Sequence, residues 1–595
     1  MSENAFDTND LNEALADVAE RKPVHPGQQI NADQAKIAHE KGWAEPAVYN
    51  YDAYNDSGPS GAEPTKEEGF PIWASNAQKY EWDDEYGDVG PRNEDLESQL
   101  FRHEFASIQG SRLSSLNEFE VTNEGPVKIN PIREFSDAGL HPIMLENIML
   151  CGYGKPTPVQ AYTLPAVLKN HDVIACAQTG SGKTAAYLIP TLSKLMGKAK
   201  KLAAPRPTLG NFNPETDNAR AEPLILVVAP TRELSAQIFD DARRFCYRSM
   251  LRPCVIYGGA PAREQRAELA RGCDVLIATP GRLIDFMEKP HILSLSRVKY
   301  TIIDEADEML QPDWEADLGK IFAGGDTNED ADHVYMMFSA TFNKETRKLA
   351  KKFMATDHMR IRVGRAGSTH VNVEQQIIAT DESMKRQALY DILIAMPPAR
   401  TMIFVNNKKS ADLLDDYLYN NGLPSTSIHS DRTQREREDA LRAFKTATAP
   451  ILIATGVSAR GIDVRSVMHV INYDLPSVEH GGIDEYIHRI GRTARIGNQG
   501  LATSFYSEER DEPIAQDLVK ILIESKQKIP EFFQQYVPEG GKLDFDDESD
   551  NEGDEETGGD SAWGSGGNAW GASTDQAAPA ESGWGAAGGS KPAGW

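Results

Sequence analysis

The stretch AQTGSGKT, which begins at Ala177, separates an apolar run, DVIACA, from a helix-like pattern, TAAYLIPTLSKLM. This order predicts a buried strand, a glycine-rich loop and a helix. Gly180 and Gly182 lack the Cβ atom that would keep backbone N–H groups away from phosphate oxygens. The pattern indicates an ATP-binding loop in which Lys183 reaches the β- and γ-phosphates and Thr184 binds Mg²⁺. A chance glycine-rich turn is the alternative, because Ala177 stands where the general pattern has glycine.

Two acidic residues open the sequence DEAD at 304–307, directly after the apolar run VKYTIID. A carboxylate at a strand end beside a phosphate loop can hold the Mg²⁺ that bridges the β- and γ-phosphates, and we assign this role to Asp304. Glu305 can then orient or deprotonate the attacking water. A chance pair of acids is plausible for DE alone, but much less so when a phosphate loop precedes it at this spacing.

Three arginines, Arg489, Arg492 and Arg495, recur at a spacing of three in HRIGRTAR. If the segment is helical, successive arginines share one face. Solvated surface arginines are one interpretation. The other is an arginine finger that stabilises charge on the transferring phosphoryl group only when two domains close.

Short apolar runs that end in polar residues recur along the chain, first in ILVVAPTREL, DVLIATPGR and VYMMFSAT, then in RTMIFVNN, APILIATG and VMHVINYD. Strands that alternate with helical segments predict an α/β fold with parallel sheets, whose carboxyl ends gather ligands. The second set contains no GKT, which indicates a similar domain without a phosphate loop. Gly, Ser and Asn cluster at 362–376, where we expect the two domains to join.

The net charge of −28 is concentrated at the two ends of the chain. Residues 1–100 carry a net charge of −15 and residues 543–595 one of −11, which leaves −2 for the middle. The acidity therefore does not exclude a local basic groove for nucleic acid. Both ends are poor in aliphatic clusters, and such a composition favours disorder.

The five cysteines show no CxxC spacing and mostly sit in apolar runs, which favours buried, reduced thiols. The first residues form no apolar signal segment, and no apolar run is long enough to span a bilayer. We expect a soluble, intracellular protein.

Aromatic residues are set into both ends. In the N-terminal stretch they occur in GWAEPAVYNYDAY and around Trp73 and Trp82, where they either anchor a partner protein or contact nothing specific. The tryptophans of the Gly/Ala/Ser-rich tail either dock into partner pockets or belong to a low-complexity segment that favours condensates. These are Trp563, Trp570, Trp584 and Trp595.

Eight segments occur in an order and at spacings that resemble the DEAD-box RNA helicases: GYGKPTPVQ, AQTGSGKT, PTREL, TPGR, DEAD, SAT, ARGID and HRIGRTAR. HSDRTQREREDAL and the flanks of the first motif resemble the Vasa-like and Ded-like translation-initiation branch. The resemblance implies two tandem RecA-like domains. The implied boundaries are 1–125 for a disordered acidic extension, 126–365 for the ATP-binding domain, 366–540 for the C-terminal helicase domain and 541–595 for a disordered acidic, Gly/Trp-rich tail.

The resemblance also implies the nucleotide contacts. Gln160 and Thr157 would read the adenine edge, because an amide can both donate and accept, although an ordinary helix start also explains Gln160. Tyr153 would stack on the base with Phe135 in support. Asp463 would hold the ribose. The phosphate-loop contacts would be Gln178, Thr179, Gly180, Ser181, Gly182, Lys183 and Thr184.

Four residues would couple the ATP site to RNA: Asp307, Ser339, Thr341 and His488. Arg492 and Arg495 would be the fingers. The implied RNA contacts are small, backbone-donating or cationic residues, so binding should be independent of base sequence and sensitive to salt. They are Pro230, Thr231, Arg232, Gly259, Thr279, Pro280, Gly281, Arg282, Gln434, Arg437, Thr455 and Gly456.

Two positions depart from the family pattern. Gly456 stands where many relatives have Asp or Ala, and Ala494 stands where the usual residue is Gly. The methyl group of Ala494 is expected to slow domain closure slightly.

The implied function is ATP- and Mg²⁺-dependent unwinding of RNA duplexes, or remodelling of RNA–protein complexes, in translation initiation. The implied setting is the cytoplasm, with nuclear shuttling an option, and a monomeric core that binds initiation factors through its tails. The alternative is an ATP-gated RNA clamp that nucleates a complex through its tryptophan-bearing tails.

Overall fold

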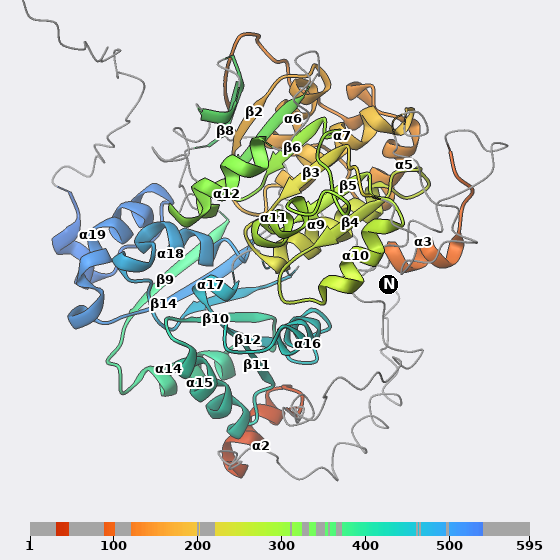
Figure 1. The fold of residues 1–595 in the computed structure, drawn as a ribbon. Helices are drawn as coiled ribbons and strands as arrows, with labels where there is room; N and C mark the ends of the chain where they lie inside the picture. Colours follow the sequence, from red (N-terminus) through yellow and green to blue (C-terminus); the bar gives the residue numbers. More distant parts are fainter. Residues whose placement is uncertain are drawn as a thin grey trace, which may run out of the picture. The chain divides into compact units, whose positions relative to one another are not determined.

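The computed structural model of the 595-residue chain describes residues 31–46, 89–101, 121–198, 202, 220–309, 312–323, 333–340, 352–354, 357–364, 372–459, 462, 464, 466–494 and 499–538. These residues hold two sheets, each accompanied by helices (Figure 1). The part from β1 to β8 is called the first lobe, and the part from β9 onward the second lobe. Most of the two acidic ends that were predicted to be disordered lie outside the described residues.

The first lobe contains an eight-stranded sheet in the order β1-β8-β2-β7-β6-β3-β5-β4. Neighbouring strands are parallel, except that β1 and β8 pair antiparallel. The sequence predicted β2, β3, β5, β6 and β7 but not the other three. The strands are β1 (Val121–Glu124), β2 (Val173–Cys176), β3 (Ile225–Val228), β4 (Pro253–Ile256), β5 (Val275–Ala278), β6 (Tyr300–Ile303), β7 (Val334–Ser339) and β8 (Met359–Val363).

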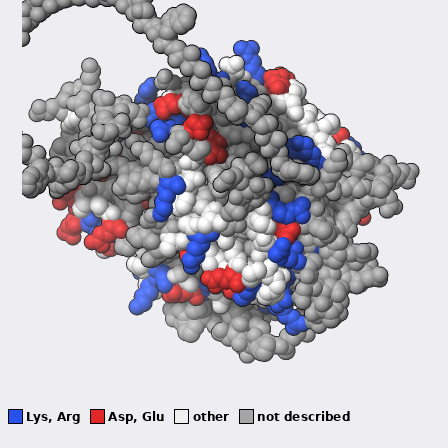
Figure 2. Space-filling model, turned by 45° about the horizontal axis from the view of Figure 1, so that its top comes forward, with Lys and Arg blue, Asp and Glu red and all other residues white. Residues whose placement is uncertain are grey.

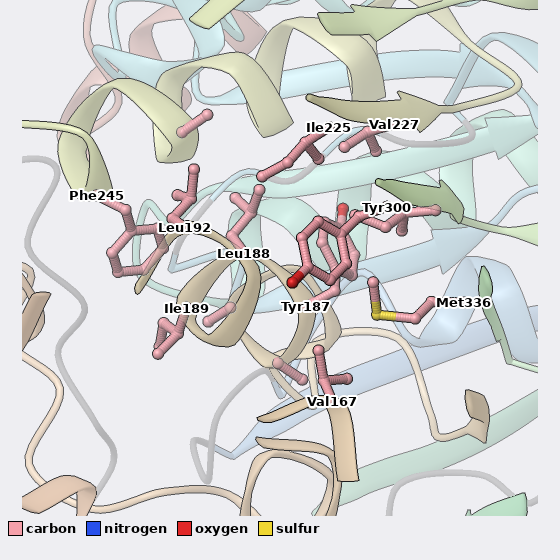
Figure 3. Close-up of a cluster of buried hydrophobic side chains, with 14 of the residues drawn as sticks. Val167, Tyr187, Leu188, Ile189, Leu192, Ile225, Val227, Phe245, Tyr300 and Met336 are labelled. Carbon is pink, nitrogen blue, oxygen red and sulfur yellow. The ribbon is translucent and has the colours of Figure 1, made fainter. Parts of the chain in front are cut away.

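Helix α7 lies at the centre of the first lobe's core. It packs against α6 and α9, and Figure 3 shows its side chains Tyr187, Leu188 and Leu192 among residues of other elements such as Ile225 and Phe245. The helices are η4 (Phe135–Ala138), α5 (Pro142–Leu150), α6 (Pro158–Leu168), α7 (Lys183–Met196), α9 (Arg232–Phe245), α10 (Ala262–Ala270), α11 (Pro280–Met287), η5 (Ala306–Met309) and α12 (Pro312–Ala323).

The second lobe contains a six-stranded parallel sheet in the order β11-β12-β10-β13-β14-β9. Its strands are β9 (Val373–Ala379), β10 (Thr401–Val405), β11 (Ser425–Ile428), β12 (Ile451–Thr455), β13 (His469–Asn472) and β14 (Gly500–Tyr506). Its helices are α14 (Lys385–Ala395), α15 (Lys408–Asn420), α16 (Gln434–Lys445), α17 (Gly456–Ala459), η6 (Val478–His480), α18 (Gly482–Ile490), α19 (Glu508–Glu524) and η8 (Glu531–Tyr536). The predicted fold, two tandem RecA-like domains built on parallel sheets, is confirmed.

Strand β8 ends at Val363 and β9 begins at Val373, so the predicted join at 362–376 spans the end of the first sheet's last strand and the start of the second sheet's first strand. The four domain boundaries drawn from the sequence stay a prediction. All five cysteines are buried and none forms a disulfide, as expected. Among the described residues, none of the helices has the length and apolar character needed to cross a bilayer.

The N-terminal stretch contains a short helix, α2 (Ala32–Glu40), that packs on the second lobe. Asn31 N donates to Asn420 O at 2.7 Å, and the Tyr390 hydroxyl donates to Gln34 O at 3.0 Å. Trp43 is buried in the cluster formed by α14 and α15. Of the two interpretations offered for the N-terminal aromatics, neither holds for Trp43, because this tryptophan is anchored on its own chain.

A second N-terminal helix, α3 (Glu94–Leu100), packs on the first lobe. Leu96 and Leu100 bury their side chains against Tyr247, whose hydroxyl accepts from Asn93 N at 3.0 Å. Arg244 donates to Leu100 O at 3.0 Å. Composition did not predict α2, α3 or β1, because each draws its stability from a lobe rather than from its own sequence.

We expect Ala38→Arg to release α2 from the second lobe, because Ala38 has no exposed surface and a buried, unpaired guanidinium is strongly unfavourable. Amide hydrogen exchange of residues 32–43 in the full chain should accelerate by roughly tenfold or more. Ala32→Arg is the matched control, since Ala32 is exposed on the same helix. Equal exchange in the two variants would contradict the docking.

The buried imidazole of His469 makes the stability of the second lobe depend on pH. Burial lowers the pKa of His469 to about 4, and the ring bonds to the Thr503 hydroxyl at 2.8 Å. A histidine in the unfolded chain titrates near pH 6.5. As the pH falls from about 7 to 4, His469 therefore binds a proton in the unfolded chain but stays neutral in the folded chain. Stability is therefore lost over this window, by up to about 3 kcal/mol.

The corresponding variant is His469→Gln, which cannot be protonated. Differential scanning calorimetry measures both melting temperatures. At pH 7.5 the wild type should melt at the higher temperature, and the difference between the two melting temperatures should narrow as the pH falls to 5. A difference that stays constant over this range would show that His469 is not the group responsible.

Candidate active site

The glycine-rich loop lies between the end of β2 at Cys176 and the start of α7 at Lys183. Gly180 and Gly182 have φ angles of 73° and 88°, a region that other residues adopt only with strain. A Cβ atom on Gly182 would also lie 2.5 Å from Gln160 Nε2. The glycines are therefore required for the shape of the loop as well as for access to a phosphate.

Lys183 is buried, and its Nζ donates to Ala177 O at 2.8 Å. This bond links the first residue of α7 back to the start of the loop. The backbone N–H groups of the loop and of the first turn of α7 follow one another along this segment. The Ser181 hydroxyl is buried here without a hydrogen-bond partner. An oriented set of donors at a helix N-terminus is a binding site for phosphate.

Gln160 connects this loop to the segment before α6. Its Oε1 accepts from Thr157 N at 3.0 Å, in a capping box that starts α6, and its Nε2 donates to Gly182 O at 3.0 Å. Both ends of the amide are thus engaged by the protein. The adenine-reading roles of Gln160 and Thr157 stay predictions.

The aromatic residues assigned to the base lie on the same lobe. Tyr153 is partly buried, with its ring centroid 6.1 Å from that of Phe245, and Phe135 is buried at the start of η4. Their contacts with adenine stay predictions. Three site residues predicted from the sequence, Thr341, Asp463 and Arg495, fall outside the described residues.

Asp304 lies at the carboxyl end of β6, facing the first turn of α7. Its Oδ2 accepts from the Tyr187 hydroxyl at 2.8 Å and its Oδ1 accepts from Glu305 N at 3.0 Å. Burial raises the pKa of Asp304, and the charge of Lys183 and the Tyr187 hydrogen bond act in the opposite direction. A buried carboxylate of this kind gains from a cation placed beside it.

Glu305 adopts a backbone conformation that only glycine reaches without strain, with φ at 49°. Such strain collects at functional sites, where the surroundings impose it. Its Oε2 atom is buried without a hydrogen-bond partner. Burial raises the pKa of Glu305, and the charge of Arg492 partly counteracts it. Glu305 is thus an underbonded carboxylate suited to accept a proton from water.

The residues of the loop and of the DEAD segment fit a magnesium nucleotide. Two buried polar atoms, Ser181 Oγ and Glu305 Oε2, lack partners, and the carboxylate of Asp304 is desolvated next to an ammonium. A hydroxyl and a carboxylate are ligand types that Mg²⁺ prefers. Thr184 and Asp304 would hold the ion, and the backbone of the loop would hold the phosphates.

The coupling residues come together at the contact between the lobes. Asp307 Oδ2 accepts from Ala340 N at 3.3 Å, next to the buried Ser339. His488 Nε2 lies 3.7 Å from Asp307 Oδ2, and its Nδ1 lies 3.3 Å from Glu308 Oε1. Burial alone lowers the pKa of His488, but the bond to Glu308 and the surrounding acids outweigh burial and raise it. The imidazole ring is therefore suited to carry a positive charge among three acids, Asp307, Glu308 and Glu485.

The arginine motif is only partly as predicted. Helix α18 ends at Ile490, so the arginines do not continue along one helical face. Arg489 is buried and pairs with Glu485 at 3.0 Å, which is a structural role. Arg492 follows the helix, is also buried, and donates to His488 O and Ile462 O at 3.1 and 3.2 Å. Of the two described arginines of the motif, Arg492 is the one whose charge lowers the pKa of Glu305.

The loop and the arginine motif also meet through backbone. The Thr179 hydroxyl donates to Gly491 O at 3.4 Å, and a Cβ atom on Gly491 would lie 2.4 Å from Thr179 Oγ1. Glycine at 491 therefore allows the two lobes to approach at the phosphate loop.

Of the two departures from the family pattern, Gly456 has a structural explanation, whereas Ala494 has a strained backbone. Ala494 has a φ of 56°, where glycine would be unstrained, and a left-handed conformation costs other residues about 1 kcal/mol or more. A Cβ atom on Gly456 would lie 2.3 Å from Glu485 Oε1, so a larger residue would displace the partner of Arg489.

Predicted RNA contacts from both lobes lie side by side. Arg232 Nη1 donates to Gln434 Oε1 at 2.9 Å, and Arg437 Nη2 pairs with Glu233 Oε1 at 2.7 Å. A Cβ atom on Gly259 would lie 2.3 Å from Arg232 Nη1, so glycine leaves room for the guanidinium. Burial lowers the pKa of Arg232 and the charge of Arg437 lowers it further, while the charge of Glu233 acts in the opposite direction.

The other RNA contacts lie at strand ends and helix starts. Thr231 caps α9 with its side chain, Arg282 donates to Ala260 O at 3.2 Å, and Thr455 and Gly456 stand at the end of β12. Pro230 precedes the start of α9, and Thr279, Pro280 and Gly281 begin α11. Their contacts with RNA stay predictions, but their placement suits a track that reads phosphates.

Figure 2 shows acidic and basic residues interspersed over the described part of one face. That part carries no broad field of a single sign. Binding of a polyanion would depend on local groups such as Arg232, Arg437 and Arg282 rather than on net charge.

Sequence reasoning missed three residues of this site. Tyr187 reads as an ordinary apolar position of α7, Glu308 as a solvated acid, and Glu485 as part of a helix surface. Nothing in the sequence marks the first. The last two carried a weak signal. Glu308 directly follows the motif residue Asp307, and Glu485 lies four positions, one helical turn, before Arg489 of the arginine motif.

Comparison with known proteins agrees with this geometry. Residues 157–349 match the family model described as DEAD/DEAH box helicase, and residues 384–497 match the helicase conserved C-terminal domain, together just over half of the chain. A structure of S. cerevisiae Dbp5 bound to RNA and ADP BeF3 is 28% identical, with a TM-score of 0.55, and the match covers 67% of this chain and 95% of that one. A structure of Mss116p bound to ssRNA and AMP-PNP is 25% identical, with a TM-score of 0.54, and the match covers 67% and 86%.

Proposed function

The chain belongs to the DEAD-box family and is an ATP-dependent RNA helicase, and from that premise we propose that it unwinds structured RNA in translation initiation as a member of the Vasa- and Ded-like branch. The observation that supports the proposal is the contact of Arg232 and Glu233 with Gln434 and Arg437, which joins segments of the two lobes that carry predicted RNA contacts. The HSDRTQREREDAL segment, which contributes Gln434 and Arg437, also carries the resemblance to this branch.

Each residue of the ATP site has a distinct task. Glu305 orients the attacking water and takes its proton, because its buried Oε2 has no competing donor. Lys183 leaves Ala177 O for the β- and γ-phosphates when nucleotide enters. Arg492, supplied by the second lobe, stabilises charge on the γ-phosphate.

Magnesium belongs to this proposal. Thr184 and Asp304 would hold the ion, which when bound neutralises charge on the β- and γ-phosphates. Asp304 offers a desolvated carboxylate whose orientation is set by two hydrogen bonds.

The RNA side depends on both lobes at once. When RNA lies across Arg232, Gln434 and Arg437, its phosphates replace the contacts of Arg232 with Gln434 and of Arg437 with Glu233. None of the three reads base edges in this role, so we expect binding to be independent of sequence. A strand bent to follow both lobes cannot keep its complement paired locally.

The proposal also covers the compartment, the oligomeric state and the partner proteins. We propose that the protein acts in the cytoplasm, possesses a monomeric core and binds initiation factors through the tryptophans of residues 541–595. Support comes from the sequence of the tail, where Trp563, Trp570, Trp584 and Trp595 are set among Gly, Ala and Ser.

One experiment separates a helicase from an ATP-gated clamp. Displacement of a short strand from an RNA duplex and residence time on single-stranded RNA are measured in ATP with the full chain. A helicase should displace the strand with turnover of ATP and leave RNA quickly. Long residence with little displacement would favour the clamp.

The role in initiation is tested in a translation extract depleted of this protein. Adding it back should restore translation of reporters with structured 5′ leaders more than of reporters with unstructured leaders. A protein lacking residues 543–595 should restore less, although its RNA-stimulated ATPase is intact. Equal restoration of both reporters would contradict the proposed role.

A further inference from the structure

Tyr187 is a buried polar residue of α7 that none of the roles above uses. It follows Thr184 by three positions and Lys183 by four, so the three side chains share one helical face. Its hydroxyl donates to Asp304 Oδ2 at 2.8 Å, and Thr184 is a second hydrogen-bond partner of the same oxygen. One hydroxyl thus links the two residues assigned to Mg²⁺.

The ring of Tyr187 is fixed by its surroundings. It has no exposed surface, and its centroid lies 5.0 Å from that of Phe338 on β7. Figure 3 shows it enclosed by apolar neighbours that include Tyr300, Met336 and Val167.

The bond from Tyr187 acts on a carboxylate that is held at both oxygens. The second oxygen, Oδ1, accepts from Glu305 N at 3.0 Å. Together the two bonds set the plane of the Asp304 carboxyl group. The tyrosine oxygen also hydrogen-bonds to the Thr184 side chain, so it contacts both proposed ligands. Groups that orient metal ligands in this way typically contribute 10- to 100-fold to metal affinity.

We propose that Tyr187 is a positioning residue for the metal: it holds the Asp304 carboxylate and the Thr184 hydroxyl in the orientation that binds Mg²⁺. The proposal rests on the magnesium site put forward under the proposed function. Tyr187 has no exposed surface, so it offers no group to the nucleotide itself. Its loss should therefore weaken the contribution of Mg²⁺ while leaving metal-free nucleotide binding intact.

The test uses Tyr187→Phe, which keeps the ring and removes the hydroxyl. Thr191→Val is the matched control, because Thr191 is equally buried, lies one turn further along α7 and donates to Tyr187 O at 2.7 Å, without reaching Asp304. It too removes one buried hydroxyl from the same helix. Melting temperatures without metal or nucleotide verify that both variants fold.

Two readouts are taken with the full chain. The first is the affinity for fluorescent ADP in Mg²⁺ and in EDTA. The second is the Mg²⁺ concentration that gives half of the maximal RNA-stimulated ATPase. In Y187F the EDTA affinity should match the wild type, the gain in affinity on adding Mg²⁺ should shrink, and half-saturation should need about tenfold more Mg²⁺. T191V should behave as the wild type.

The outcomes separate the proposal from its premise. An unchanged Mg²⁺ requirement in Y187F, or an equal shift in T191V, would overturn the role of Tyr187. A wild type whose ADP affinity and ATPase ignore Mg²⁺ would overturn the magnesium site itself, and the role of Tyr187 with it. RNA-stimulated hydrolysis in that case would still leave the helicase assignment standing.

Discussion

Glu305→Gln should lower RNA-stimulated ATP turnover by about 10²- to 10⁴-fold, because it removes the base while keeping the size and shape of the side chain. The affinities for ATP and RNA should stay within a few-fold of the wild type. In the structure, Oε2 of Glu305 is buried without a partner, and its backbone is held in a strained conformation. Steady-state ATPase and equilibrium binding with the full chain measure the two effects separately.

The pH dependence of the same reaction gives a second signature. Burial raises the pKa of Glu305, so the carboxylate that accepts the proton is lost as the pH falls through this raised value. The wild-type kcat should therefore decline on the acid side, and the residual activity of E305Q should lack this decline. Glu288→Gln, the same change at an exposed position, is the control. Full activity in E305Q would refute the assignment of the base.

The fold was predictable where one local pattern carried the whole signal. Strands such as β3 and β6 are continuous apolar runs, which a parallel sheet covered on both faces requires. The P-loop was predictable because its glycines are needed by local backbone geometry at Gly180 and Gly182. In these segments the cause lies within a few residues of its effect.

Features stabilised by distant partners could not be predicted in this way. Helix α2 is stabilised because Ala38 and Trp43 are buried against the second lobe. The local sequence of the N-terminal stretch does not indicate that this surface is available. Tyr187 bonds to Asp304 across 117 positions of the chain. The arginine motif shows the converse, since equal spacing suggested equal roles until the helix end at Ile490 separated Arg489 from Arg492.

Because Arg489 and Arg492 have separate roles, we expect their substitutions to have different effects, and the loss of Arg492 to reduce turnover strongly. Arg492→Gln should lower RNA-stimulated turnover by about 10³-fold or more, the range found when an arginine that stabilises the transferring phosphoryl group is lost. Its guanidinium is held by two carbonyls of its own lobe and already influences Glu305 electrostatically. ATP affinity without RNA should change little, because the arginine acts when the lobes are closed.

Arg489→Gln is the comparison that tests this division of roles. Removing Arg489 takes the paired cation from the buried Glu485, and breaking a buried ion pair typically costs about 3–5 kcal/mol, so the melting temperature should fall. Arg492→Gln should instead melt close to the wild type and lose turnover. If the two variants lost stability and turnover in the same proportion, the motif would act as one structural unit, and hydrolysis would not depend on an arginine delivered by the second lobe.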